Sequence, residues 1–255
     1  MKKITLLATL LAGNVFAGSM GPIESTYDFG GLYGGLGAGV ISVYSAEQFA
    51  TTRTRTASDV SRVTDTLVMF SGDVGYGRMI RQNTYLGIKG SIYYAPQETS
   101  TNNSFATPSS STVTLGNNTF NSIYRPIYNI DAVIGYEFIP HLMPFFEAGV
   151  TFANINRSFL SKRTRTDLTT NSSVTYKYII NMDDYETSYN VGVGLNYQPH
   201  KNVILSTEFV YADLGSNNGA ASAPIPGTSL TEYQTRKLNS NALAILATVS
   251  YLIPA

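Results

Sequence analysis

The sequence predicts an all-β protein, specifically an eight-stranded antiparallel transmembrane up-and-down β-barrel. Three observations carry this prediction. The composition disfavours helices, the chain alternates large apolar residues with small or polar ones, and the connections between the alternating segments are short and long in turn. Alternation with a period of two is the pattern of a strand whose two faces meet different surroundings.

The composition is poor in charge and rich in small residues. Of the 255 residues, 13% are charged, about half the usual share of roughly 25%. The 22 glycines and the frequent Ser, Thr and Asn residues favour strands and turns over helices. Lys and Arg together number 17, as do Asp and Glu, and this zero net charge excludes a protein that binds nucleic acid mainly through phosphates. Because Cys is absent, thiol nucleophiles and iron–sulfur clusters are excluded, and we expect no cofactor.

Residues 1–17 have the pattern of a secretion signal. Lys2 and Lys3 precede the apolar run Ile4–Val15, and Val15 and Ala17 occupy the small positions of a cleavage site. A short buried helix is the alternative interpretation of this segment. We expect an exported protein in which residues 18–30 form a periplasmic lead-in. No later stretch is long and apolar enough for a membrane-spanning helix.

Eight alternating segments follow the lead-in. In the fourth of them, for example, Ile130 and Ile134 share one parity, and Asn129 and Asp131 share the other. We expect the large apolar residues to face lipid and the small polar residues to face inward, with tyrosines near the strand ends forming aromatic girdles. The eight predicted strands are approximately Gly31–Tyr44, Thr66–Ile80, Thr84–Tyr94, Ile123–Phe138, Pro144–Ile155, Tyr185–Tyr197, Val203–Leu214 and Leu238–Ile253.

The connections between these segments alternate strictly in length. Soluble sandwiches have no reason to alternate in this way, whereas bacterial membrane barrels join their strands by short periplasmic turns and longer extracellular loops. We therefore predict a barrel over residues 31–255. A soluble secreted β-protein is the alternative if the alternation is accidental. The short connections are residues 81–83, 139–143 and 198–202, and the four predicted extracellular loops are approximately residues 45–65, 95–122, 156–184 and 215–237.

The segment Gly31–Val40, with the sequence GLYGGLGAGV, resembles the first strand of the OmpA-like outer-membrane β-barrel family, which includes opacity-type surface proteins. The resemblance implies a monomeric eight-stranded barrel in the bacterial outer membrane with variable surface loops. It also implies recognition by the barrel assembly machinery of a last strand that usually ends in an aromatic residue. This chain departs from that ending, because Tyr251 is its last aromatic residue and Pro254 and Ala255 close the sequence.

Five charged residues are predicted to lie on the inner face near the same height. Each lies at a similar distance along its strand from the nearest short turn. Charges inside a narrow lumen must pair or contact water, so the set fits either a small cation-favouring pore or a polar plug. The plug is favoured because eight strands leave little more than side-chain space. The residues of this lumen charge cluster are Asp73, Lys89, Asp131, Glu147 and Glu208.

A near-repeat of basic residues lies on the first and third predicted loops, in TRTRT and KRTRT. Alternating Arg and Thr in an extended chain puts both Arg side chains on one face, ~6.6 Å apart. Such a ladder would bind lipopolysaccharide phosphates or acidic host glycans; solvated hairpin arms are the alternative. The residues of this basic ladder are Arg53, Arg55, Lys162, Arg163 and Arg165.

Enzymatic and metal-binding signals are weak. His141 and His200 fall in predicted periplasmic turns, and the acidic group Asp183, Asp184 and Glu186 lies near the outer rim without a histidine. We predict no catalytic residue and no metal site. The expected function is structural and surface-interactive, through contact with outer-membrane lipid, lipopolysaccharide or a host surface. A narrow porin-like channel for ions or small solutes is the alternative.

Overall fold

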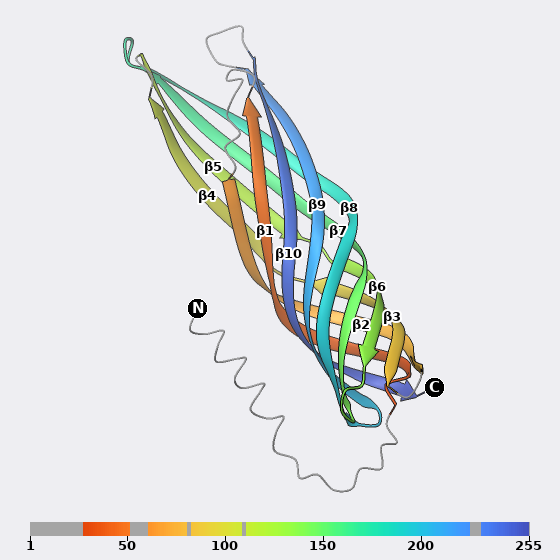
Figure 1. The fold of residues 1–255 in the computed structure, drawn as a ribbon. Coiled ribbons are helices and arrows are strands. Elements are labelled where there is room, and N and C mark those ends of the chain that lie inside the picture. Colours follow the sequence, from red (N-terminus) through yellow and green to blue (C-terminus); the bar gives the residue numbers. More distant parts are fainter. Residues whose placement is uncertain (1–27, 52–60, 81–82, 109–110, 225–230, 255) are drawn as a thin grey trace.

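The computed structural model describes residues 28–51, 61–80, 83–108, 111–224 and 231–254 (Figure 1). The predicted signal segment and two members of the basic ladder, Arg53 and Arg55, lie outside the described residues. Within the described ranges no helix has the length and hydropathy needed to cross a bilayer. The strands found there are β1 (Gly31–Thr51), β2 (Ser61–Ile80), β3 (Thr84–Tyr94), β4 (Glu98–Pro108), β5 (Thr112–Tyr124), β6 (Ile127–Tyr136), β7 (Leu142–Asp167), β8 (Ser172–His200), β9 (Val203–Pro224) and β10 (Thr231–Pro254).

Eight of these described strands close an antiparallel ring. Each of β1, β2, β3, β6, β7, β8, β9 and β10 pairs with the next in that order, and β10 pairs back to β1, where Gly31 lies opposite Pro254. Closure leaves the ring without a free edge. The predicted eight-stranded up-and-down barrel is confirmed.

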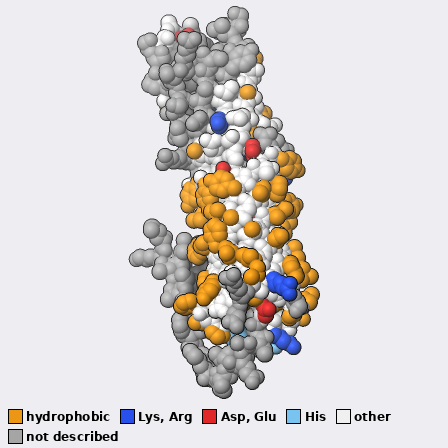
Figure 2. Space-filling view, turned by 45° about the vertical axis from the view of Figure 1, so that its right-hand side comes forward, with side chains coloured by type: hydrophobic (Ala, Val, Ile, Leu, Met, Phe, Trp, Pro, Cys, Tyr) orange, Lys and Arg blue, Asp and Glu red, His pale blue; other side chains and the backbone are white. Residues whose placement is uncertain are grey.

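The outer face of the ring carries the predicted apolar set. Leu36, Val74 and Ile88 are 77%, 56% and 65% exposed, and hydrophobic side chains cover the barrel part of the molecule in Figure 2. Exposed tyrosines lie at the turn end of this band, as at Tyr136, and at its other edge, as at Tyr94. The alternation of the strands is therefore explained by a lipid-facing surface.

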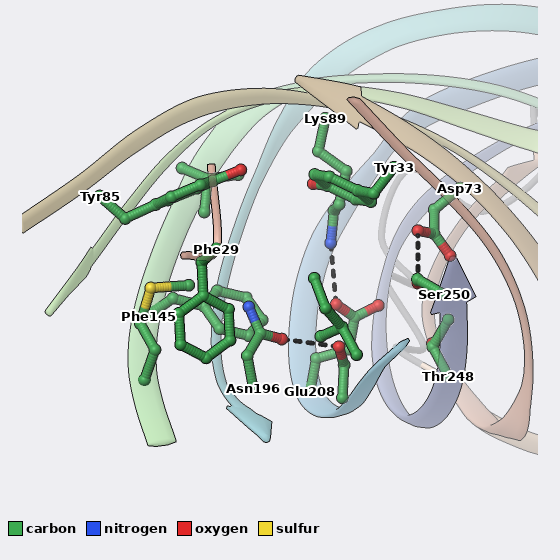
Figure 3. A pocket seen from close by; sticks show the side chains of 14 residues that line it. Phe29, Tyr33, Asp73, Tyr85, Lys89, Phe145, Asn196, Glu208, Thr248 and Ser250 are labelled. Carbon is green, nitrogen blue, oxygen red and sulfur yellow. Dashed lines mark hydrogen bonds and ion pairs between the residues drawn. The ribbon is translucent and has the colours of Figure 1, made fainter. Parts of the chain in front are cut away.

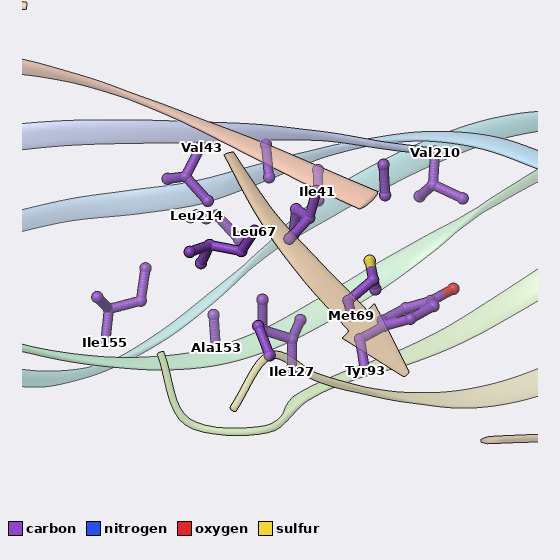
Figure 4. Close-up of a cluster of buried hydrophobic side chains, with 14 of the residues drawn as sticks. Ile41, Val43, Leu67, Met69, Tyr93, Ile127, Ala153, Ile155, Val210 and Leu214 are labelled. Atoms are coloured by element: carbon purple, nitrogen blue, oxygen red, sulfur yellow. The ribbon is translucent and has the colours of Figure 1, made fainter. Parts of the chain in front are cut away.

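The interior is layered rather than uniformly polar, which corrects the expectation that the inward parity is small and polar. Along β10, Leu252 lies in an apolar layer at the turn end, Ser250 follows in a polar level, and Leu246 belongs to a second apolar layer. This middle apolar layer is drawn in Figure 4. A narrow barrel packs its interior with side chains. The middle layer contains Ile41, Val43, Leu67, Met69, Tyr93, Ala95, Ile127, Ala153, Ile155, Val210, Ala212, Leu214, Ala242, Ala244 and Leu246.

Beyond the ring the strands continue as two four-stranded sheets. Pairing of β7 with β8 runs from Leu142 opposite Tyr197 to Asp167 opposite Ser172, and the β4–β5 hairpin joins the far half of β7. The first sheet is thus β4-β5-β7-β8, and the second is β9-β10-β1-β2. The β8–β9 ladder ends at the pair Asn190–Ala212, where the two sheets separate (Figure 1).

The two sheets pack face to face as a sandwich above the barrel. Phe159, Ile180 and Met182 of the first sheet are at most 4% exposed, and Ala221 of β9 packs against them. Much of what the sequence predicted as long loops is therefore strand, because the same period-two pattern continues with polar residues on the outer face. We call this part of the molecule the extension.

Candidate functional site

The lumen charge cluster centres on Lys89 of β3. Its Nζ lies 2.5 Å from Glu147 Oε2 of β7. The same Nζ lies 2.8 Å from Glu208 Oε2 of β9 (Figure 3). The side chains are buried, with Glu147 only 1% exposed. One cation between two buried carboxylates compensates their charge, and it ties three strands of the ring together.

The other two predicted acids flank this contact. Asp73 of β2 accepts a hydrogen bond from Ser250 Oγ at 3.3 Å. Asp131 of β6 is 1% exposed and lies directly opposite Lys89 in the β3–β6 ladder. The structure therefore brings Lys89, Glu147 and Glu208 into contact and puts both aspartates on neighbouring strands. Within the described ranges no group of three His, Asp or Glu side chains is arranged to hold a metal ion.

A small cavity lies on the turn-end side of Lys89. Its volume is about 30 Å³, room for roughly one or two waters. The rings of Phe29, Tyr33 and Tyr85 line it toward the turn end (Figure 3). Phe29 belongs to the predicted lead-in, yet it is 1% exposed and packs in the same apolar layer at the turn end as Leu252. Gly75 leaves the space that the Tyr33 ring occupies, so the base of the barrel is filled by aromatic side chains.

The level above Lys89 is also closed. Thr151 Oγ1 donates to Asn129 Oδ1 at 2.9 Å, and Asn190 Nδ2 donates to Thr151 Oγ1 at 3.1 Å. The middle apolar layer follows and holds a cavity of about 10 Å³ beside Tyr93 and Ile127. Spaces with room for about one or two waters are too small for an ion that keeps its first shell of water.

The basic ladder does not share one outer face. Arg163 and Arg165 have the inward parity of β7, the same side as the fully buried Phe159, and the Arg163 guanidinium lies 5.6 Å from the Tyr178 ring centroid. Lys162 points outward and is exposed opposite Lys177 of β8. The expectation of two Arg side chains on one face is met by Arg163 and Arg165, but their face is the one toward the second sheet.

Two buried arginines of the extension escaped the sequence analysis. Arg157 donates from Nη1 to Ser240 Oγ at 2.9 Å and from Nη2 to Ser45 Oγ at 3.1 Å, which joins the two sheets. Arg236 Cζ lies 3.2 Å from the Phe159 ring centroid, and burial lowers the pKa of its guanidinium. The signal available in the sequence was parity, since Arg236 continues the inward series of β10.

Comparison with known proteins agrees with this architecture. The sequence profile of the outer membrane protein beta-barrel domain matches residues 4–242. The chain belongs to this family. No curated protein matches the sequence.

Solved outer-membrane proteins resemble this chain at low identity, and the fold is shared with OprG. OprG from Pseudomonas aeruginosa is 8% identical, with 90% of this chain and 98% of that chain covered and a TM-score of 0.53. Neisserial surface protein A is 12% identical, with 85% and 97% covered and a TM-score of 0.33. Ail of Yersinia pestis is 13% identical, with 86% and 99% covered and a TM-score of 0.25.

Membership of this family places the protein in the outer membrane. That location accounts for the apolar band, because side chains such as Leu36 and Ile88 meet lipid rather than water. It also accounts for the closed ring, since every backbone hydrogen-bonding group at membrane depth needs a partner within the protein.

Proposed function

We propose that this outer-membrane barrel is closed to ions and acts at the cell surface by contacting lipopolysaccharide through its extension. The observation that carries the proposal is the unbroken β7–β8 pairing out to Asp167 and Ser172, far beyond the apolar band. The β6–β7 and β8–β9 turns lie at the opposite end of the barrel, where the β2–β3 ladder also ends at Ile80 and Thr84. Short turns are periplasmic in bacterial barrels. The extension therefore projects from the cell as a rigid arm.

The candidate contact is the pair Lys162 and Lys177. The two residues face each other across the β7–β8 ladder, and both are exposed on the outer face. Like charges directly opposite each other in a sheet are destabilising. A phosphate between them would relieve that repulsion and gain charge-assisted hydrogen bonds. Acidic host glycans offer the same chemistry. We favour lipopolysaccharide because the outer face of the extension points along the membrane plane, toward neighbouring lipopolysaccharide molecules.

The test is the double variant Lys162→Ser with Lys177→Ser. We expect its affinity for lipopolysaccharide vesicles to fall by roughly tenfold, because two charge-assisted hydrogen bonds are lost. The defect should shrink at about 0.15 M salt. Lys201→Ser, in an exposed turn at the other end of the barrel, is the matched control and should bind as the parent does. Unchanged binding by the double variant would overturn the proposed contact.

A narrow channel is the second candidate function, and planar bilayers distinguish the two. The cavities of about 30 Å³ and 10 Å³ on either side of the charge cluster favour a closed lumen. Pure protein should therefore give no conductance steps. Steps that change on Lys89→Ala would contradict a closed barrel and support the channel.

Other parts of the proposal rest on the sequence. Residues 1–17 are proposed as the export signal, residues 18–30 as the lead-in and residues 31–255 as the barrel with its surface segments. A monomeric state, insertion by the barrel assembly machinery and the absence of enzymatic activity stay predictions. Gel mobility of heated and unheated samples after detergent extraction, together with light scattering, tests the barrel and its oligomeric state.

A further inference from the structure

A polar hollow opens on the outer face of the second sheet, just beyond the apolar band. It has a volume of about 420 Å³ and spans β2, β1, β10 and β9. Four of its side chains form one row across these strands, since Tyr44 lies opposite both Thr64 and Asn241, and Asn241 lies opposite Asp213. Tyr211 and Asn239 also line the hollow.

A β-bulge lies beside the hollow. On β10 only Ser240 separates Asn239 from Asn241, whereas their partners on β9, Ser216 and Asp213, are separated by two residues. One of these is Gly215, whose φ of 74° lies in the left-handed region that favours glycine. Asp213 Oδ1 accepts a hydrogen bond from the Gly215 N–H at 3.0 Å. The bulge thereby fixes the carboxylate and bends the sheet locally.

The lining chemistry suits a sugar ring. Asn239 and Asn241 offer amide donors and acceptors, Asp213 offers a carboxylate, and Thr64 offers a hydroxyl. These groups match the vicinal hydroxyls of a saccharide, and the exposed Tyr44 ring offers an amphipathic surface for its C–H face. Among the described lining residues there is no Lys or Arg, so the hollow itself does not suit a phosphate.

The surroundings identify the source of the sugar. Leu243 lies one outward-facing row closer to the barrel than Tyr44 and Asn241, and Val40 lies two rows closer. Each is 42% exposed and belongs to the lipid-facing band. Lys237 lies two residues beyond Asn239 on the same outer face and is exposed. A ring in the hollow would therefore have acyl chains on one side and a cation on the other. Phosphorylated glycolipids have this order of acyl chain, sugar and phosphate.

We propose that this hollow binds a sugar ring in the headgroup of an outer-leaflet glycolipid, with Asp213 and Asn241 as its main hydrogen-bonding groups. The inference deepens the proposed contact with lipopolysaccharide and shares its orientation in the membrane. It rests on residues of the second sheet, whereas Lys162 and Lys177 belong to the first. The two contacts can therefore fail separately.

The experiment compares Asn241→Leu and Asp213→Asn with the parent protein in detergent. Asp213→Asn keeps an acceptor for the Gly215 N–H and removes the charge. Asn181→Leu, an exposed position on the outer face of β8, is the matched control. The probes are dephosphorylated lipid A and the acyl-free glucosamine disaccharide. We expect each hollow variant to bind the lipid about fivefold to tenfold more weakly, and Asn181→Leu to bind as the parent does. Gel mobility of unheated samples checks that each variant forms a barrel.

Each outcome decides one point. Parent-like binding of dephosphorylated lipid A by Asn241→Leu would overturn the sugar site, even if the Lys162 and Lys177 variant loses lipopolysaccharide binding. Equal affinity for the acyl-free disaccharide would overturn the lipid headgroup as the source. Loss of binding in the hollow variants, with the double lysine variant unaffected on this phosphate-free probe, supports the site independently of the first sheet.

Discussion

The barrel and the extension each bury a cation, and they hold it in different ways. In the barrel, the Lys89 ammonium lies 2.5 Å and 2.8 Å from two carboxylates on other strands. In the extension, the Arg236 guanidinium lies against a pair of neighbouring rings, with Cζ 3.2 Å from the Phe159 centroid and 5.3 Å from that of Phe120. A compact ammonium suits convergent oxygens, and a planar guanidinium suits flat rings.

The difference shows how each region is closed. The ring of strands is closed by backbone hydrogen bonds between its strands. The charged side chains inside it therefore only have to compensate one another. The two sheets of the extension are not joined by a described ladder beyond Asn190 and Ala212, so side chains such as Arg236 and Arg157 provide contact between them. Removing a cation should therefore have different consequences in the two places.

The largest effect is expected at Lys89. Lys89→Met leaves Glu147 and Glu208 as neighbouring buried carboxylates without their cation, and breaking such a group costs about 3–5 kcal/mol. The measurement is urea unfolding of the protein folded in lipid vesicles. The triple variant Lys89→Met, Glu147→Gln, Glu208→Gln should recover most of the loss, because no buried charge remains. A single variant as stable as the parent would contradict the ion-pair closure of the barrel.

A smaller effect is expected at Arg236. Arg236→Met keeps an unbranched apolar side chain against the Phe159 ring and loses the cation–π attraction, worth about 1–2 kcal/mol when desolvated. The loss should appear as faster hydrogen exchange in β9 and β10 beyond the barrel, with the urea midpoint of the barrel unchanged. Lys237→Met, at the adjacent exposed position, is the control. Destabilisation of the whole barrel would show that the two regions are not independent.

The lipid-facing residues of the barrel could be predicted from the sequence. Large apolar residues recur at every second position, and Val68, Phe70 and Val74 are exposed as that parity predicts. The contact of Lys89 with Glu147 also follows from counting residues from the short turns, because all strands of an up-and-down barrel begin at one level. These inferences need only the period of a strand and one fixed end.

The inner apolar layers and the pairing of β7 with β5 could not be predicted in this way. In β1, Val40 and Ile41 are adjacent and both apolar, so alternation does not tell which faces inward; the structure has Val40 exposed and Ile41 buried. The β4 sequence is polar on both parities, because its hairpin stands outside the membrane. The inward side of Arg163 depends on strand β7 continuing past Ile155, where the sequence predicted a loop.

The smallest effect is expected at Asp167, a charge at the surface of the extension, in contrast to the two buried cations. At the end of β7, Asp167 Oδ1 accepts hydrogen bonds from the N–H groups of Thr169 at 2.8 Å and Thr170 at 3.2 Å. These bonds hold the pKa of Asp167 below its ordinary value of 3.8. The charged carboxylate therefore stabilises the folded turn above pH 3.8, and this contribution is lost as the pH falls through the lowered pKa.

The measurement is amide hydrogen exchange at Thr169 and Thr170, corrected for the intrinsic pH dependence. Protection at these two amides should fall by roughly twofold to threefold between about pH 6 and about pH 2, while amides of the barrel keep theirs. Asp167→Asn keeps an acceptor without the charge, so at neutral pH it should show the weaker protection that the parent shows in acid. Because the carboxylate lies at the protein surface, neither change should alter the urea midpoint, whereas Lys89→Met lowers it. A shift of that midpoint by Asp167→Asn would mean that the tip of the extension and the ring unfold as one unit.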